Sequence, residues 1–111
     1  RALKFAELEE GFWTTEYVDL DSGVGQSSKL LILPSEEPLI TYTGTSAGLR
    51  YATRNAKDPE LWDITTLDPL AIESFSLGAM VSPGPALHIS YPVWEEDGTN
   101  LYYACANLEQ Q

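Results

Sequence analysis

The stretch LITYTGTSAGLRYA, residues 39–52, decides the fold because the chain contains a second version of it. It returns as HISYPVWEEDGTNLYYA, residues 88–104, with a loop that is three residues longer. Both versions place short runs rich in β-branched and aromatic residues on either side of a loop that contains glycine, which predicts a β-hairpin. A hairpin that recurs within 111 residues indicates a repeat architecture.

The repeat extends beyond this hairpin. The pairs of identical residues that lie 49 positions apart include Trp13 and Trp62, Asp19 and Asp68, Pro34 and Pro83, Ile40 and Ile89, and Tyr42 and Tyr91. A third marker occurs three times, as LKFA at residues 3–6, LRYA at residues 49–52 and LYYA at residues 101–104. A period near 50 residues predicts a propeller or a similar repeat array.

The chain is expected to be all-β. Eight segments of strand length are bounded by Gly, Pro, Asp, Asn or Ser, at residues 13–20, 26–33, 38–43, 49–53, 62–67, 75–81, 86–91 and 101–106. Residues 3–10 look helical, but their LKFA matches the other two copies, so they are interpreted as a ninth strand. Residues 44–48 and 95–100 are expected to be hairpin loops, the second using Asp97-Gly98 in its turn.

The pattern resembles β-propeller repeats with a consensus like "SSL…P-HISY…LxYA…W". The matching stretches are GQSS at 25–28, PLITY at 38–42, LRYA at 49–52, Trp62, HISY at 88–91 and LYYA at 101–104. The resemblance implies two four-stranded antiparallel blades and an extra edge strand. Each blade would run from an SSKLLI-type strand through ITY-type and LxYA-type strands to a Trp-led strand. The whole of 1–111 is interpreted as one module, with repeat units at about 13–61 and 62–106 and an N-terminal strand in 1–12.

Two blades cannot close a ring, because propellers usually contain four to eight. The chain is therefore expected to form a homo-oligomer or to need the remainder of a larger propeller.

Composition limits the partners. The net charge is −11, which disfavours nucleic acid and anionic membrane, since both need a basic surface. Hydrophobic residues make up 43%, enough for a core, and no apolar run approaches the roughly 18 residues of a membrane span. Cys105 is the single cysteine, so no internal disulfide is possible. A soluble protein is expected, and the compartment, secreted or cytoplasmic, stays open.

The longer hairpin loop is the first candidate for a ligand site. A tryptophan with carboxylates and an amide is a combination used to bind sugars, where the ring stacks on the sugar and polar groups hold its hydroxyls. The candidate residues are Trp94, Glu95, Glu96, Asp97 and Asn100. The alternative is a solvated acidic hairpin.

A calcium loop is the second candidate. Asp19 and Asp21, followed by Gly23, place oxygen ligands at alternate positions, as Ca²⁺ requires. No third ligand and no closing glutamate follow, so the alternative is a polar connection between blades. No metal site and no cofactor are expected.

Trp13 and Trp62 either form repeated pockets between blades or anchor the outer strands, and recurrence at the period favours the structural role. Propeller lectins also place an Arg and a Glu near each sugar, but Arg50 has Lys4 and Tyr102 as its counterparts, so that pattern does not repeat. His88 and Cys105 lack a third group for a catalytic triad. The chain is expected to be a non-catalytic binding module with carbohydrate as ligand. The alternatives are a structural or protein-interaction propeller segment and a fragment of a larger propeller protein.

Overall fold

The computed structural model describes residues 2–21, 23–45, 47–69 and 77–108, and only the backbone of Trp94. In these ranges the chain consists of nine strands without a helix: β1 (Leu3–Glu9), β2 (Phe12–Asp19), β3 (Val24–Ile32), β4 (Pro38–Gly44), β5 (Gly48–Arg54), β6 (Trp62–Asp68), β7 (Gly78–Ser82), β8 (Ala86–Glu95) and β9 (Gly98–Asn107). The all-β expectation is confirmed, including the strand in place of a helix near the N-terminus. The start of the expected strand 75–81 lies outside the described residues. In the described part of the chain there is no helix of a length and apolarity that would cross a membrane.

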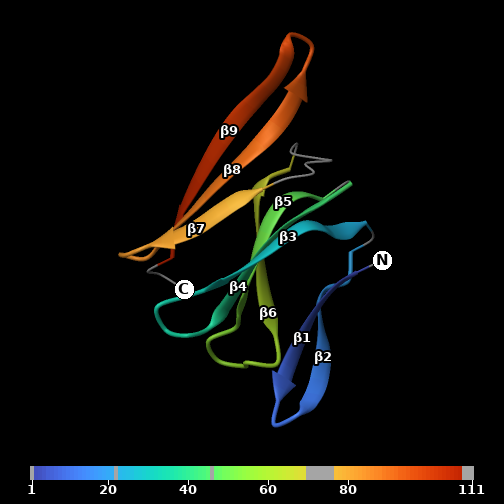
Figure 1. Ribbon diagram of the computed structural model, residues 1–111, viewed down its shortest axis with the longest axis vertical. Helices are drawn as coiled ribbons and strands as arrows, with labels where there is room; N and C mark the ends of the chain where they lie inside the picture. Colours follow the sequence, from blue (N-terminus) through green and yellow to red (C-terminus); the bar gives the residue numbers. More distant parts are fainter. Residues whose placement is uncertain (1, 22, 46, 70–76, 109–111) are drawn as a thin grey trace.

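The strands form three antiparallel sheets, each made of consecutive strands. They are the hairpin β1–β2, the central sheet β3–β4–β5–β6 and the C-terminal sheet β7–β8–β9. The central sheet has the expected strand order and lies between the other two (Figure 1). The C-terminal sheet has three strands in the described residues, where four were expected. The sheets divide the chain after Asp19 and Asp68, because each Trp-led strand pairs with the strand that precedes it. The repeat units at about 13–61 and 62–106 stay a prediction.

The pairing register repeats between sheets. In β1–β2, Leu3 lies opposite Asp19, and the register shifts directly after Leu3. In β5–β6, Leu49 lies opposite Asp68, and the register shifts directly after Leu49. Two strand pairs of different sequence thus share the same register and the same bulge, as expected for copies of one structural unit.

A second register repeats in the same way. Ile40 of β4 lies opposite Ala52 of β5, and Ile89 of β8 lies opposite Ala104 of β9. β9 is therefore the structural equivalent of β5, and β5 is the equivalent of β1.

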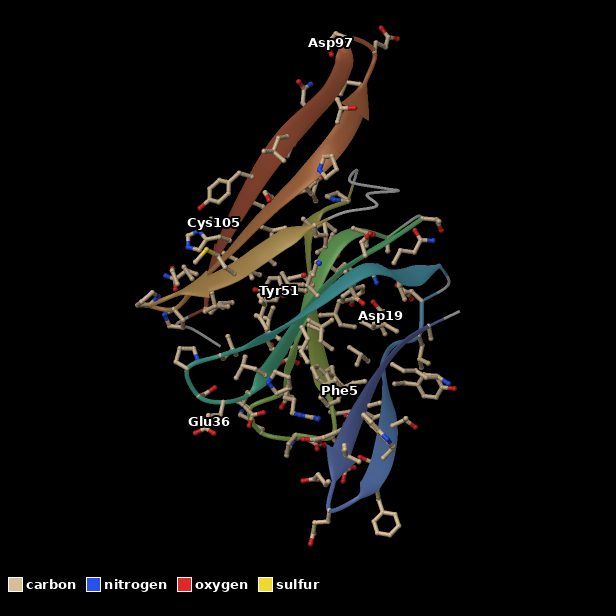
Figure 2. All side chains as sticks on the ribbon, in the orientation of Figure 1. Phe5, Asp19, Glu36, Tyr51, Asp97 and Cys105 are labelled. Carbon is tan, nitrogen blue, oxygen red and sulfur yellow. The ribbon has the colours of Figure 1, made fainter. Side chains whose placement is uncertain are left out.

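Two hydrophobic cores lie between the sheets. The first joins the β1–β2 hairpin to the central sheet and contains Leu3, Val18, Val24, Ile40, Tyr42, Ala47 and Ala52. The second joins the central sheet to the C-terminal sheet and contains Leu39, Leu49, Tyr51, Leu77, Leu87, Ile89, Tyr91 and Leu108. Figure 2 shows Tyr51 in this second region and Phe5 beside the first. β4 supplies both cores because its side chains alternate between its two faces, so it is buried along most of its length.

Gly48 allows the close approach of β6 to the β4–β5 turn. Its φ is +78°, and a Cβ atom there would lie 2.2 Å from the Asp68 carbonyl oxygen. Only glycine fits a position with both constraints.

Candidate functional site

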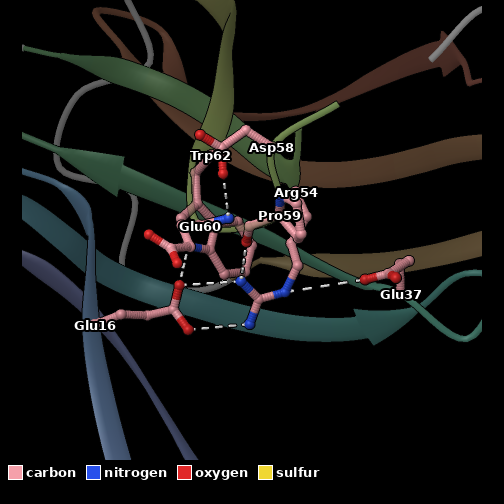
Figure 3. Close-up of polar contacts among 7 residues, drawn as sticks. All are labelled: Glu16, Glu37, Arg54, Asp58, Pro59, Glu60 and Trp62. Atoms are coloured by element: carbon pink, nitrogen blue, oxygen red, sulfur yellow. Dashed lines mark hydrogen bonds and ion pairs between the residues drawn. The ribbon is translucent and has the colours of Figure 1, made fainter. Parts of the chain in front are cut away.

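An ion pair joins the first two sheets. Arg54, the last residue of β5, contacts Glu16 of β2 through two parallel hydrogen bonds, Nη1 to Oε1 and Nη2 to Oε2, each 3.0 Å long. The indole Nε1 of Trp62 donates to the same Oε1 atom over 2.8 Å (Figure 3). Trp62 lies opposite Arg54 in the β5–β6 register, so both donors approach the carboxylate from adjacent strands.

Aromatic rings enclose the guanidinium of Arg54. Its central carbon lies 4.6 Å from the centre of the Trp62 ring and 5.4 Å from that of Phe5. Nη1 also donates to the Pro59 carbonyl over 2.8 Å. The hydrogen bonds from Arg54 lower the pKa of Glu16 and outweigh the opposing effect of burial, and the same bonds raise the pKa of Arg54. Both groups therefore stay charged across the physiological range.

A hollow of about 450 Å³ opens beside this ion pair, and Glu16, Arg54, Pro59 and Glu60 line it. Its outer wall is the β5–β6 turn, which is held by side chain to backbone hydrogen bonds. The Asn55 Oδ1 atom accepts from the amides of residues 57 and 58, and the Asp58 carboxylate accepts from the Glu60 amide over 3.1 Å. The hollow thus offers carboxylate acceptors and a guanidinium donor on an ordered turn.

A second polar cluster lies where β2 ends. The Tyr42 hydroxyl donates to Asp19 Oδ2 over 2.7 Å, and Arg50 Nη1 donates to Asp19 over 2.7 Å and to Asp21 over 2.8 Å. Burial of Asp19 favours the protonated acid, but the hydrogen bonds from Tyr42, the Asp21 amide and Arg50 outweigh it and lower the Asp19 pKa. Burial and the Asp19 carboxylate raise the pKa of Tyr42.

This cluster contains the two aspartates that were considered for calcium. Arg50 bridges both carboxylates, so their oxygens face a guanidinium. Within residues 2–21, 23–45, 47–69 and 77–108, no group of three or more His, Cys, Asp or Glu side chains is arranged to hold a metal ion.

Half of this cluster repeats. Tyr91 donates to Asp68 Oδ2 over 2.7 Å, and the partners are 23 residues apart in both copies. The arginine does not repeat. Its counterpart Lys4 lies 5.0 Å from the centre of the Tyr17 ring, and its counterpart Tyr102 contacts the Tyr91 ring. The hydrogen bond, here called the Tyr–Asp clasp, is therefore the part common to both sheet interfaces.

The longer hairpin loop lies at the far tip of β8–β9, where Figure 2 labels Asp97. Glu95 pairs with Gly98, so Glu96 and Asp97 form a two-residue turn. Glu95 Oε1 accepts hydrogen bonds from the side-chain amide of Asn100 and from the Tyr102 hydroxyl. The structure thus brings Glu95 and Asn100 together.

The other candidate residues in this loop are Trp94, Glu96 and Asp97, and they are not part of these hydrogen bonds that Glu95 accepts. Glu96 and Asp97 are exposed at the turn. The side chain of Trp94 lies outside what the structure describes. A ligand site in this loop stays a prediction.

Another hollow, of about 330 Å³, lies on the outer face of the C-terminal sheet. Its lining includes Met80, His88 and Tyr103. His88 Nε2 lies 2.8 Å from Ser82 Oγ, and Nδ1 lies 2.6 Å from the Tyr103 hydroxyl. His88 is half-buried, and both of its ring nitrogens lie within hydrogen-bond distance of a neighbouring hydroxyl group.

The two repeated tryptophans have different environments. Trp62 is half-buried and packs edge-on against Phe5 of the preceding sheet. Trp13 is 67% exposed, so the anchoring role expected for it is not seen. The partner of Trp62 comes from the sheet before its own, and no described sheet precedes the one that contains Trp13.

Sequence reasoning missed the pairing of Glu16 with Arg54. Neither residue recurs at the repeat period, since Thr65 and Leu8 occupy the equivalent positions. The spacing therefore carried no signal for it. No family model, curated protein or solved structure matches this chain.

Proposed function

We propose that this chain is a stretch of a β-propeller-type array that serves as a non-catalytic binding module. The repeated strand registers and the Tyr–Asp clasp support the array, because each sheet contacts the next one through equivalent atoms. In such an array a sheet is one blade, and the clasp joins the last strand of one blade to the second strand of the next.

The two outer faces support the expectation that further sheets cover this stretch. On β1–β2, Leu8, Trp13 and Tyr17 are exposed, and on the C-terminal sheet Met80 and Tyr103 are exposed. Exposed apolar side chains that gather on one face are typical of interaction surfaces. The covering sheets come from further copies of the chain or from the rest of a larger propeller.

The ligand that we propose is a neutral carbohydrate in the hollow beside Arg54. This hollow is the single observation that carries the proposal. Its volume of about 450 Å³ lies within the usual range of small-molecule sites. Glu16 and Glu60 provide acceptors for sugar hydroxyls, and Pro59 and the aliphatic part of Arg54 provide apolar contact. The net charge of −11 disfavours anionic sugars.

A second candidate is a structural or protein-interaction role without a small-molecule site. The observation that favours it is the pair of hydrogen bonds between Glu16 and Arg54, since each of these groups already has the other as its hydrogen-bond partner. In that case the hollow is filled with water, and the ion pair serves only to join two sheets.

A glycan array followed by calorimetric titration of the best neutral sugar tests the proposal. We expect Glu60→Gln to weaken binding about tenfold, which corresponds to one charge-assisted hydrogen bond. Trp94→Ala and the matched control Glu9→Gln should bind like the wild type. Binding that is lost in Trp94→Ala and kept in Glu60→Gln would move the site to the hairpin loop. No binding to any neutral glycan would favour the interaction role.

A further inference from the structure

In the part of the chain that the structure describes, one edge of β9 pairs with no other strand. Among the described residues, β8 is its only neighbour in the sheet. Its sequence GTNLYYACAN contains no charged residue and no proline, and its register with β8 runs without a bulge. Natural proteins usually protect edge strands with charges, prolines, bulges or short length. With ten residues, β9 has none of these protections, and Leu101 on it is 76% exposed.

The other two copies show which kind of strand occupies this edge. β1 and β5 are the equivalents of β9, and each pairs on that side with a strand that contains a tryptophan near its start, β2 or β6. Trp13 lies opposite Leu8, and Trp62 lies opposite Arg54, at the same position of the register. Two examples within the chain thus fix the type of strand, its direction and its register.

We propose that the edge of β9 at residues 101–106 binds an antiparallel strand of the β2 and β6 type. Its tryptophan lies opposite Ala106, and the next residue lies opposite Cys105. Main-chain hydrogen bonds supply the affinity, and the side chains on alternate positions supply the specificity. This inference rests on the proposed array, because the register is transferred from β5 to β9 through their equivalence.

The side chains of β9 suit this partner. Ala104 and Ala106 are small, half-buried and packed against the second core. The strand pair β5–β6 places Ile64 opposite Ala52, the equivalent of Ala104. A large apolar side chain on the incoming strand would extend the core over the two alanines, and burial of each such side chain stabilises the complex.

Disulfide trapping tests the register on the full chain. A synthetic peptide of residues 60–69 with Asp63→Cys, activated as a mixed disulfide, is incubated with the protein. Asp63 lies opposite Thr53, the equivalent of Cys105, which has an exposed free thiol. The matched control is the same peptide with Thr66→Cys in place of Asp63→Cys, which keeps Ile64 and whose sulfur would point to the opposite face of the sheet.

We expect the Asp63→Cys peptide to react with Cys105 at least tenfold faster than the control peptide. The unmodified peptide, added in excess, should slow that reaction to the rate of the control. Equal rates for the two peptides, or a rate that the unmodified peptide does not change, would overturn the proposal. This experiment tests only strand binding at the β9 edge. Mutagenesis of the two Tyr–Asp clasps tests a different property, namely how the described sheets pack on one another. Failure of one is therefore distinguishable from failure of the other.

Discussion

The hydroxyl of Tyr42 donates a 2.7 Å hydrogen bond to the carboxylate of Asp19, and this bond joins the second strand of one sheet to the last strand of the sheet before it. Tyr91 and Asp68 form the same bond at the next interface over the same distance. Both aspartates lie at the strand bulge that repeats with the register. The clasp therefore occurs at both described interfaces between sheets, and its four residues are two of the pairs that lie 49 positions apart.

The clasp predicts a dependence of stability on pH. The pKa of Asp19 is lowered in the folded state, so its ionised form adds stability above its unfolded pKa of about 3.9. That stability is lost as the pH falls through the lower folded pKa. Urea denaturation between pH 7 and pH 2.5 should show a steep loss below about pH 4. Asp19→Asn should be less stable at pH 7 and should show a smaller loss. An equal loss in wild type and variant would assign the acid sensitivity to other carboxylates.

Tyr42 predicts a loss of stability at high pH. Its pKa is raised in the folded state, so the neutral phenol adds stability that is complete below the unfolded pKa of about 10. The stability should decline as the pH rises above that value, and absorbance of the phenolate at 295 nm should report Tyr42 only on unfolding. Tyr42→Phe should remove this part of the alkaline loss. The control Tyr17→Phe changes an exposed ring and should leave it in place.

Replacing each of the two repeated tryptophans with alanine should change the unfolding free energy by different amounts. Trp62→Ala removes a ring that packs on Phe5 and Arg54 and donates to Glu16, and it should cost about 3 kcal/mol of unfolding free energy. Trp13→Ala changes an exposed side chain and should cost less than about 0.5 kcal/mol in the isolated chain. Chemical denaturation of both variants measures the difference. Equal costs would contradict the different environments of the two residues.

The stability that the ion pair between Glu16 and Arg54 provides should depend on the geometry of its hydrogen bonds more than on its charge. Arg54→Lys keeps the charge but loses the two parallel hydrogen bonds and the contact with the Trp62 ring, so it should cost about 1–2 kcal/mol. The control Lys29→Ala removes an exposed cation and should be nearly neutral. Melting temperatures of the three proteins at matched ionic strength provide the measurement. If Arg54→Lys lowered stability no more than the control does, the two parallel hydrogen bonds of Arg54 would contribute nothing to stability.

Much of the fold was predictable because its signals are local or periodic. Strand positions followed from β-branched and aromatic runs, and the strand at residues 3–9 followed from its match to residues 49–52. The Tyr–Asp clasp was not predicted, although all four residues were identified as recurring. Each clasp joins residues of different sheets, and only their common separation of 23 residues could have suggested that they meet.

The candidate site was less predictable. The pairing of Glu16 with Arg54 depends on how the hairpin β1–β2 lies against the central sheet, which no local pattern encodes. The difference between the half-buried Trp62 and the exposed Trp13 also depends on packing between sheets, because Phe5, which packs on Trp62, belongs to another sheet. The arrangement of whole sheets therefore determines these features, while the local sequence determines the strands.

Double-mutant cycles at the two clasps test the central claim most directly, namely that one interface repeats between the three sheets. One cycle uses Asp19→Asn and Tyr42→Phe, the other Asp68→Asn and Tyr91→Phe, each read as the free energy of unfolding in urea. We predict favourable couplings of the same sign at both sites, each about 1–2 kcal/mol, because each bond joins a hydroxyl to a carboxylate. A coupling at Asp19 and Tyr42 with none at Asp68 and Tyr91 would contradict the claim.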